Sequence, residues 1–167
     1  MTDDTPQQGP LDPGPLVDGD LELVLAQFLA GNPAEGLVPM YRFQMRHTAD
    51  GARIGEIDLR VALTPALYQY GGNLGYYVEP DFRGRRYAAR SVRLLFGLAR
   101  AHGLDALWIT CAPDNLASRR TCELVGGVLV DIVPLPRWAA AHEPGRKLTC
   151  RYRVDLMEAD RQQQADR

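Results

Sequence analysis

Apolar and polar residues alternate with a period of two through much of the first third of the chain, in runs at 21–25, 41–47 and 54–61. Alternation of this kind is typical of strands that bury one face. The segment TADG at 48–51 separates the last two runs and favours a hairpin turn. The pattern therefore predicts three successive antiparallel strands. Glu56, Asp58 and Arg60 lie on their polar face, which we expect to meet solvent, a partner or a polar cleft.

The rest of the chain alternates between strand and helix patterns. Apolar spacing predicts one amphipathic helix from Arg86 to His102 and a second that follows 114–115 and ends before the glycine pair at 126–127. Strands are predicted at 71–78, 106–111, 128–133 and 147–156, and a long loop at 134–146. This order predicts an α/β (α+β) sheet with a parallel βαβ crossover at its centre.

The length of 167 residues fits a single folded domain, which we place at 19–157. Residues 1–18 are rich in proline and aspartate, which favours a flexible N-terminal tail. Residues 158–167 are predicted to form a polar C-terminal tail.

Composition narrows the classes of function. A net charge of −2 and a pI near 5.9 argue against a nucleic-acid-binding protein, which would normally be basic. No apolar run is long enough to span a membrane, and the acidic start of the chain does not resemble a signal peptide, so we expect a cytoplasmic protein. Cys111, Cys122 and Cys150 lack metal-site spacing, and we expect three reduced thiols and no metal.

The loop at 83–88 carries the strongest chemical signal. Arg83, Arg85 and Arg86 crowd the start of the predicted helix, where positive charge opposes the helix dipole unless an anion binds there. The alternative, a solvated charged face, fits Arg90 and Arg93 better. Neither a P-loop nor the dinucleotide pattern of three glycines is present, so the loop predicts another kind of polyphosphate site.

The segment YYVEPDFRGRRYAA resembles the acetyl-CoA-binding segment of the GNAT superfamily of N-acetyltransferases, whose signature is Gln/Arg-x-x-Gly-x-Gly/Ala. Arg83 takes the first position, Ala88 takes the last, and Arg86 replaces a glycine. PDNLASRRTCELVGG is similar to the second helix motif of that superfamily. With GGNLGYYVEP and the closing RYRVDL, these segments also resemble a bacterial subgroup of it. The resemblance covers about residues 20 to 157.

The resemblance implies a GNAT-like mixed, largely antiparallel sheet of about seven strands, in which the fourth and fifth strands splay apart. The pantetheine arm of acetyl-CoA would lie in that gap, and backbone N–H groups from 84 to 88 would hold the pyrophosphate. The implied cofactor-binding residues are Tyr76, Tyr77, Val78, Arg83, Gly84, Arg85, Arg86, Tyr87, Ala88, Asn115 and Ser118. Because a left-handed backbone costs a residue with a side chain about 1–2 kcal/mol, we expect Arg86 to have a negative φ.

Acetyl transfer to an amine needs a base, a polarised carbonyl and a proton for the leaving thiolate. The superfamily often uses a tyrosine seven residues after the helix asparagine as the acid, and Cys122 stands at that position here. Tyr76 and Tyr77 are alternative acids, and Glu123 and Glu79 are further carboxylates to weigh. The candidate catalytic residues are Glu56, Asp58, Tyr76 and Cys122.

These observations predict an acetyl-CoA-dependent N-acetyltransferase that acts on an amine of a small molecule or peptide. A catalytically silent acyl-CoA-binding module of the same fold is the first alternative, because the usual tyrosine is missing. A nucleotide-binding regulatory domain is the second. The expected partners are acetyl-CoA and an amine acceptor, without nucleic acid or membrane, and the open sheet face could join two copies in a homodimer.

Overall fold

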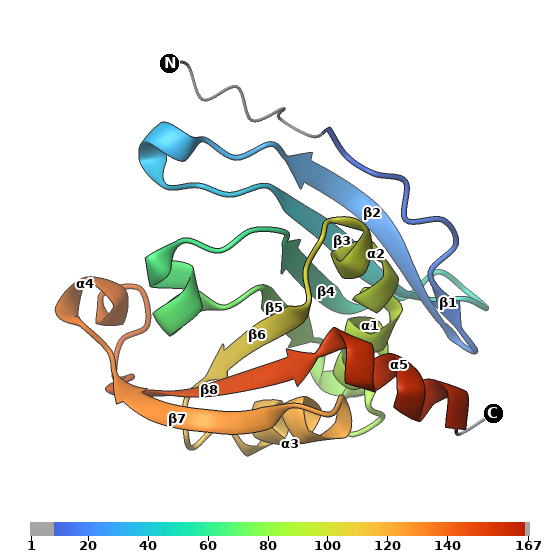
Figure 1. Ribbon diagram of the computed structural model, residues 1–167. Coiled ribbons are helices and arrows are strands. Elements are labelled where there is room, and N and C mark those ends of the chain that lie inside the picture. The colour runs from blue at the N-terminus through green and yellow to red at the C-terminus, as the bar shows by residue number, and fades with distance from the viewer. Residues whose placement is uncertain (1–8, 166–167) are drawn as a thin grey trace, which may run out of the picture.

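The computed structural model describes residues 9–165, which form two antiparallel sheets with helices packed against them (Figure 1). The first sheet has the order β1-β2-β3-β4-β5, with strands Val17–Asp18, Leu21–Leu29, Met40–His47, Arg53–Arg60 and Leu74–Val78. The second has the order β6-β8-β7, with strands Ala106–Cys111, Leu148–Asp155 and Val128–Pro134. The helices are α1 Tyr87–Leu94, α2 Phe96–Ala101, α3 Leu116–Leu124, α4 Arg137–Ala140 and α5 Leu156–Ala165, with short helices η1 Pro33–Glu35, η2 Leu67–Gly71 and η3 Pro80–Phe82.

The three strands predicted from alternation are β2, β3 and β4, and they pair in sequence as expected. Phe43, Ile57 and Leu59 are fully buried on one face, and α1 packs over them through Ala89 and Val92. The apolar face of α1 and the apolar faces of the strands together form the core. Helices therefore cover one side of the first sheet, and the polar residues of β3 and β4 point to the other side.

The sheets separate between β5 and β6, the fourth and fifth predicted strands. Just before β5, the N–H of Asn73 donates to the carbonyl of Trp108 at 2.7 Å, and the N–H of Trp108 donates to Asn73 Oδ1 at 2.8 Å. The Asn73 side chain also donates to the carbonyl of Arg60 on β4. Asn73 therefore links β4, β5 and β6 at one point. No strand ladder joins the described parts of β5 and β6 beyond it. The predicted fold with its splayed strands is confirmed.

The structure differs from the prediction in details. The described residues form eight strands because the two-residue β1 adds to the predicted set, and the helix predicted from 86 to 102 is broken at Leu95 into α1 and α2. A short helix, α4, interrupts the loop predicted at 134–146 and contacts η2 through Tyr70 and Trp138.

Strand β1 and most of helix α5 lie beyond the two ends of the predicted domain, 19–157. Leu16 is buried and β1 pairs with β2, so part of the predicted N-terminal tail contacts the sheet, while residues 1–8 lie outside the described residues. The described part of the predicted C-terminal tail is helical, because Asp155 accepts hydrogen bonds from the N–H groups of Met157 and Glu158 and so begins α5. No helix within 9–165 combines the length and hydropathy needed to cross a membrane.

Candidate functional site

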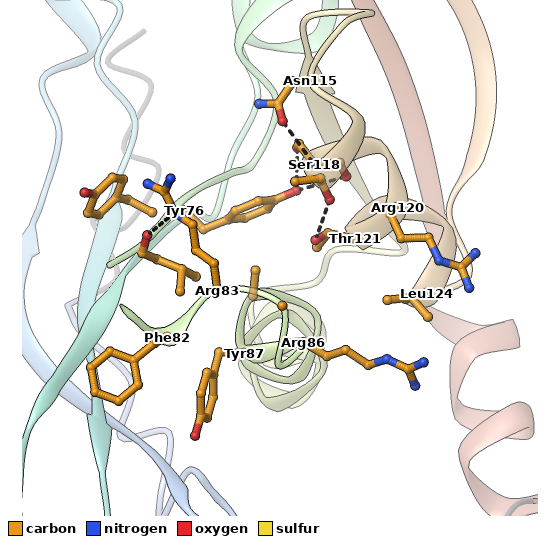
Figure 2. A pocket seen from close by; sticks show the side chains of 15 residues that line it. Tyr76, Phe82, Arg83, Arg86, Tyr87, Asn115, Ser118, Arg120, Thr121 and Leu124 are labelled. Atoms are coloured by element: carbon orange, nitrogen blue, oxygen red, sulfur yellow. Dashed lines mark hydrogen bonds between the residues drawn. The ribbon is translucent and has the colours of Figure 1, made fainter. Parts of the chain in front are cut away.

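A cavity of about 550 Å³ lies between β5, the loop that follows it, the start of α1 and one side of α3 (Figure 2). All the predicted cofactor-binding residues except Arg85 line it: Tyr76, Tyr77, Val78, Arg83, Gly84, Arg86, Tyr87, Ala88, Asn115 and Ser118. Segments 40 residues apart in the sequence thus meet around one space. The cavity also has lining residues that the sequence analysis did not select: Phe82, Ala117, Arg120, Thr121 and Leu124. A helical spacing of one turn from Asn115 and Ser118 could have indicated the residues of α3.

The edge of β5 that faces the cavity offers backbone hydrogen-bonding groups. The N–H of Glu79 donates to the carbonyl of Ile54 on β4 at 2.8 Å. Because alternate residues of an antiparallel strand bond to the same neighbour, Tyr76 and Val78 direct their backbone groups away from β4. The carbonyl of Val78 accepts a hydrogen bond from Arg83 Nε at 2.9 Å, which agrees with this direction. An extended ligand could therefore pair with β5 from inside the cavity.

The loop before α1 brings backbone N–H groups together at the cavity. Gly84 has φ of 80°, and Arg86, at the N-cap of α1, has φ of 62° and ψ of 21°. A left-handed residue followed by helical ones turns successive N–H groups to the same side, which makes an anion-binding concavity. No side chain caps α1, so its first N–H groups remain available to a ligand.

The prediction of a negative φ for Arg86 was wrong. The chain is extended at Arg83, with φ of −67° and ψ of 157°, and must turn sharply to begin α1. A left-handed residue at position 86 makes this turn, at a cost of about 1–2 kcal/mol for a residue with a side chain. The signature has glycine at this position because glycine adopts a left-handed backbone easily, and not only because it leaves space for the ligand.

The arginines of the loop differ in what they contact. Arg83 lies over the ring of Tyr77 and Arg85 over that of Phe82, whereas Arg86 extends away from the end of α1 on the side where Arg120 projects from α3 (Figure 2). No carboxylate within the described residues pairs with these three loop arginines.

Arg90 and Arg93 lie outside the cavity. Arg90 binds Asp18 and Asp20, and Arg93 donates to the carbonyl of Leu124. These two arginines fix α1 to neighbouring segments, which agrees with a structural role rather than a ligand-binding one.

Polar side chains from β5 and α3 meet at the inner end of the cavity. The hydroxyl of Tyr76 lies 2.8 Å from Ser118 Oγ, and Asn115 caps α3 by accepting from the N–H of Ser118 at 3.1 Å. Burial raises the pKa of Tyr76 above its ordinary value, so its hydroxyl is protonated at neutral pH. The Tyr76 hydroxyl is therefore a proton donor located between the edge of β5 and helix α3.

Cys122 is fully buried and does not line the cavity. Its hydrogen bond with Cys111 and its burial both raise the pKa of its thiol, which keeps it neutral. The phenol of Tyr76, reaching α3 from β5, lies on the same side of that helix as Cys122, with which it interacts. Cys111 and Cys150 are buried as well.

The structure does not bring the candidate carboxylates into the cavity. Glu56 and Asp58 lie on β4, on the polar face of the sheet, and Asp58 receives two hydrogen bonds of 2.9 Å from Arg42. Glu79 pairs with Arg53. Within 9–165, no group of three or more acidic, histidine or cysteine side chains is arranged to hold a metal ion.

The sequence model of the acetyltransferase (GNAT) domain matches residues 8–128. The chain belongs to the GNAT acetyltransferase family. No curated protein sequence matches it.

Solved structures of the same fold include RimJ from Mycobacterium smegmatis in complex with CoA-disulfide, at 20% identity and a TM-score of 0.57 over 77% of this chain and 61% of that one. The spermidine/spermine N-acetyltransferase SpeG from Vibrio cholerae has 12% identity and a TM-score of 0.56 over 74% of this chain and 70% of that one. The Microcin C7 self immunity acetyltransferase MccE, in complex with acetyl-CoA and AMP, has 14% identity and a TM-score of 0.55 over 70% and 61%. The matched region thus spans less than two thirds of the RimJ and MccE chains.

Proposed function

We propose that this GNAT protein is an N-acetyltransferase that uses acetyl-CoA and acts on an amine of a small molecule or peptide. The observation that supports this most strongly is the cavity itself, which joins a free strand edge, an uncapped helix N-terminus and a protonated phenol. Its volume of about 550 Å³ lies within the range of small-molecule sites. The similarity to RimJ, SpeG and MccE supports the same class of reaction.

The residues of the cavity fit acetyl-CoA in three parts. The N–H groups from Gly84 to Ala88 would bind the pyrophosphate, with Arg83, Arg85 and Arg86 adding positive charge. The backbone of 76–78 would pair with the amides of the pantetheine arm. Asn115 and Ser118 would lie near the thioester. Because Arg83 now bonds to the carbonyl of Val78, we expect it to release this carbonyl to a pantetheine N–H and turn to a phosphate.

We propose Tyr76 as the acid that protonates the leaving thiolate. Its hydroxyl is protonated at neutral pH, lines the cavity, and is oriented by Ser118. Cys122 and Tyr77 are weaker candidates, because Cys122 is buried behind the cavity and Tyr77 points to the other face of β5. Glu56 and Asp58 are candidates to take the proton of the acceptor. Because both lie outside the cavity, this proton would have to pass through water.

The proposal is tested by CoA release from acetyl-CoA in the presence of amines, followed with a thiol reagent. The panel should contain propylamine, spermidine, amino acid amides and short peptides with free N-termini. Turnover with any of them supports the proposal. Tight CoA binding in a thermal-shift titration without turnover would favour the silent acyl-CoA-binding module, for which the buried Cys122 is the supporting observation. Displacement of CoA by ATP would favour a nucleotide-binding domain.

Three broader expectations rest on the same proposal. We propose a single catalytic domain at 19–157 that works in the cytoplasm, where its cosubstrate would be available. We also propose that the protein needs neither nucleic acid nor a membrane surface. A homodimer stays a prediction, which size-exclusion chromatography with light scattering would test.

A further inference from the structure

Gly75 is the second of the five residues of β5, inside the strand, where glycine is unfavourable because it has no side chain to pack and the most backbone freedom to lose. A glycine in such a place is usually explained by a positive φ or by a close contact. Gly75 has neither. It is absent from the residues with positive φ, and a Cβ built on it would meet no atom within 4 Å.

Two nearby glycines show the contrast. A Cβ on Gly55 would lie 2.1 Å from the carbonyl oxygen of Tyr77, so β4 and β5 could not pair as closely with any other residue there. Gly72 has φ of 68°, and its Cβ would lie 2.5 Å from the carbonyl oxygen of Trp108. The fold therefore requires Gly55 and Gly72, whereas it does not require Gly75. β4 and β5 pair in continuous register around Gly75, so a bulge does not explain the glycine, and the remaining reason is the close approach of something that binds there.

The position of Gly75 indicates what that is. Leu74 and Tyr76 point to the helix side of the sheet, and Gly75 and Tyr77 are exposed on the opposite face. Gly75 follows the Asn73–Trp108 contact at which β5 and β6 separate, and it precedes Tyr76, whose hydroxyl reaches Ser118. A residue without a side chain thus lies where β5 and β6 begin to separate, next to Tyr76, which lines the cavity, and opposite Asp58 on the polar face.

The polar face beside Gly75 carries carboxylates. Asp58 is its partner on β4, and Glu56 is the partner of Tyr77. Both carboxylates are partly exposed; Asp58 pairs with Arg42, and Glu56 lies near both Arg42 and Arg53, so each carboxylate has a guanidinium beside it. Such a surface suits an acceptor that must arrive as an ammonium ion and lose a proton, without selecting a highly charged molecule.

We infer that the acceptor amine reaches the thioester over Gly75, and that the missing side chain at this position provides the room. This inference rests on the proposed function and assigns its acceptor path. The acceptor class is a primary amine on an unbranched carbon, because branching beside the nitrogen would occupy the space that the glycine leaves.

In the reaction, the neutral amine nitrogen attacks the thioester carbonyl carbon. An N–C bond forms as the C–S bond breaks, and the departing thiolate takes the hydroxyl proton of Tyr76. The proton lost by the acylated nitrogen returns to Tyr76 through water. Gly75 takes no part in bond making, and its role is to leave the approach to the carbonyl open.

The test compares Gly75→Ala and Gly75→Val with Gly97→Ala, a matched control on the exposed face of α2 where a Cβ also meets nothing within 4 Å. CoA release is measured with acetyl-CoA and with propylamine, isopropylamine, spermidine and glycinamide. We expect Gly75→Val to raise the KM of the accepted amines at least tenfold and to leave the KM of acetyl-CoA within twofold. Gly75→Ala should reduce turnover of the branched isopropylamine more than turnover of propylamine.

Thermal unfolding separates this result from a folding defect, because valine favours strands and has room here, so Gly75→Val should melt no lower than the wild type. Unchanged amine KM values in Gly75→Val would overturn the inference while leaving the proposed function intact. An equal loss of acetyl-CoA binding in that variant would also overturn it. If the wild type turns over none of the amines on the panel, both the proposed function and this inference fail.

Discussion

The charged side chains at the cavity and those on the polar face of β4 and β5 are arranged differently. At the cavity, Arg83 and Arg86 lie close to an uncapped helix N-terminus, and no carboxylate among the described residues pairs with them. On the other side, Asp58 is held by two hydrogen bonds from Arg42, and Glu79 by Arg53. Positive charge beside a helix N-terminus opposes the helix dipole, and a bound anion would offset that unfavourable interaction. We therefore call the cavity side, with its unpaired arginines, the proposed donor face, and the opposite side, with its paired carboxylates, the proposed acceptor face.

The largest effect should come from Tyr76, which lies on the donor face. Tyr76→Phe should lower kcat about 100-fold or more, because general acid catalysis contributes about that much, while the KM of acetyl-CoA changes little. The measurement is steady-state CoA release. Since the pKa of Tyr76 is raised by burial, wild-type activity should not decline through loss of this proton below about pH 10. Cys122→Ala, the comparison variant, should keep kcat within a few-fold; an equal loss there would contradict the assignment.

Arg83 tests whether the donor face binds an anion. Arg83→Ala should weaken CoA binding about tenfold, which corresponds to the loss of one charge-assisted hydrogen bond. Titration calorimetry at two salt concentrations should show a smaller salt dependence in the variant. Arg53→Ala, which removes a cation from the opposite face, should leave CoA affinity unchanged. Equal losses in both variants would mean that the two faces do not differ as described.

Arg86 should show a stability effect as well as a binding effect. Arg86→Gly removes the strain of a left-handed arginine and should raise the free energy of unfolding by about 1 kcal/mol, as measured by urea denaturation. Arg86→Ala keeps the strain and should not show this gain. Both variants should bind CoA a few-fold more weakly, because both remove the cation. A stable Arg86→Ala protein with the same gain would contradict the left-handed conformation.

The smallest effect is expected from the paired carboxylate on the acceptor face. Asp58→Asn should cost less than about 1 kcal/mol of stability, since the Arg42 side chain is 37% exposed and water screens the pair. CoA affinity should not change, because Asp58 is outside the cavity. A loss of CoA affinity in this variant would break the separation between donor and acceptor faces. A change in turnover alone would be consistent with Asp58 receiving a proton through water.

The residues that line the cavity could be named from the sequence because each segment of the lining is short and continuous. The strand 76–78, the loop 83–88 and the start of α3 each carry a local signal, and the structure brings them around one cavity. The strands of the first sheet were predictable for the same reason, since period-two alternation sets which face is buried. The resemblance to the GNAT superfamily supplied the splay between β5 and β6, which no local pattern shows.

Features that depend on distant contacts were not predictable. The left-handed Arg86 reflects a turn that the surrounding structure imposes against local preference. Helix α5 depends on the cap formed by Asp155, which reads in the sequence as one more residue of an alternating strand. The meeting of Tyr76 with Ser118 joins residues 42 positions apart, so the sequence could name both residues but not their contact.

Asn73 has a mechanical consequence. Its side chain and backbone tie Arg60 on β4 to Trp108 on β6 just before the strands part, and the residue is fully buried. Such a link would act as a fulcrum: if the two sheets moved relative to each other, atoms near Asn73 would shift least and distant atoms most. Gly75 and Tyr76 lie within three residues of the fulcrum, whereas the arginine loop is ten residues away. Opening of the cavity about this link would move the arginine loop while leaving Tyr76 close to its present position.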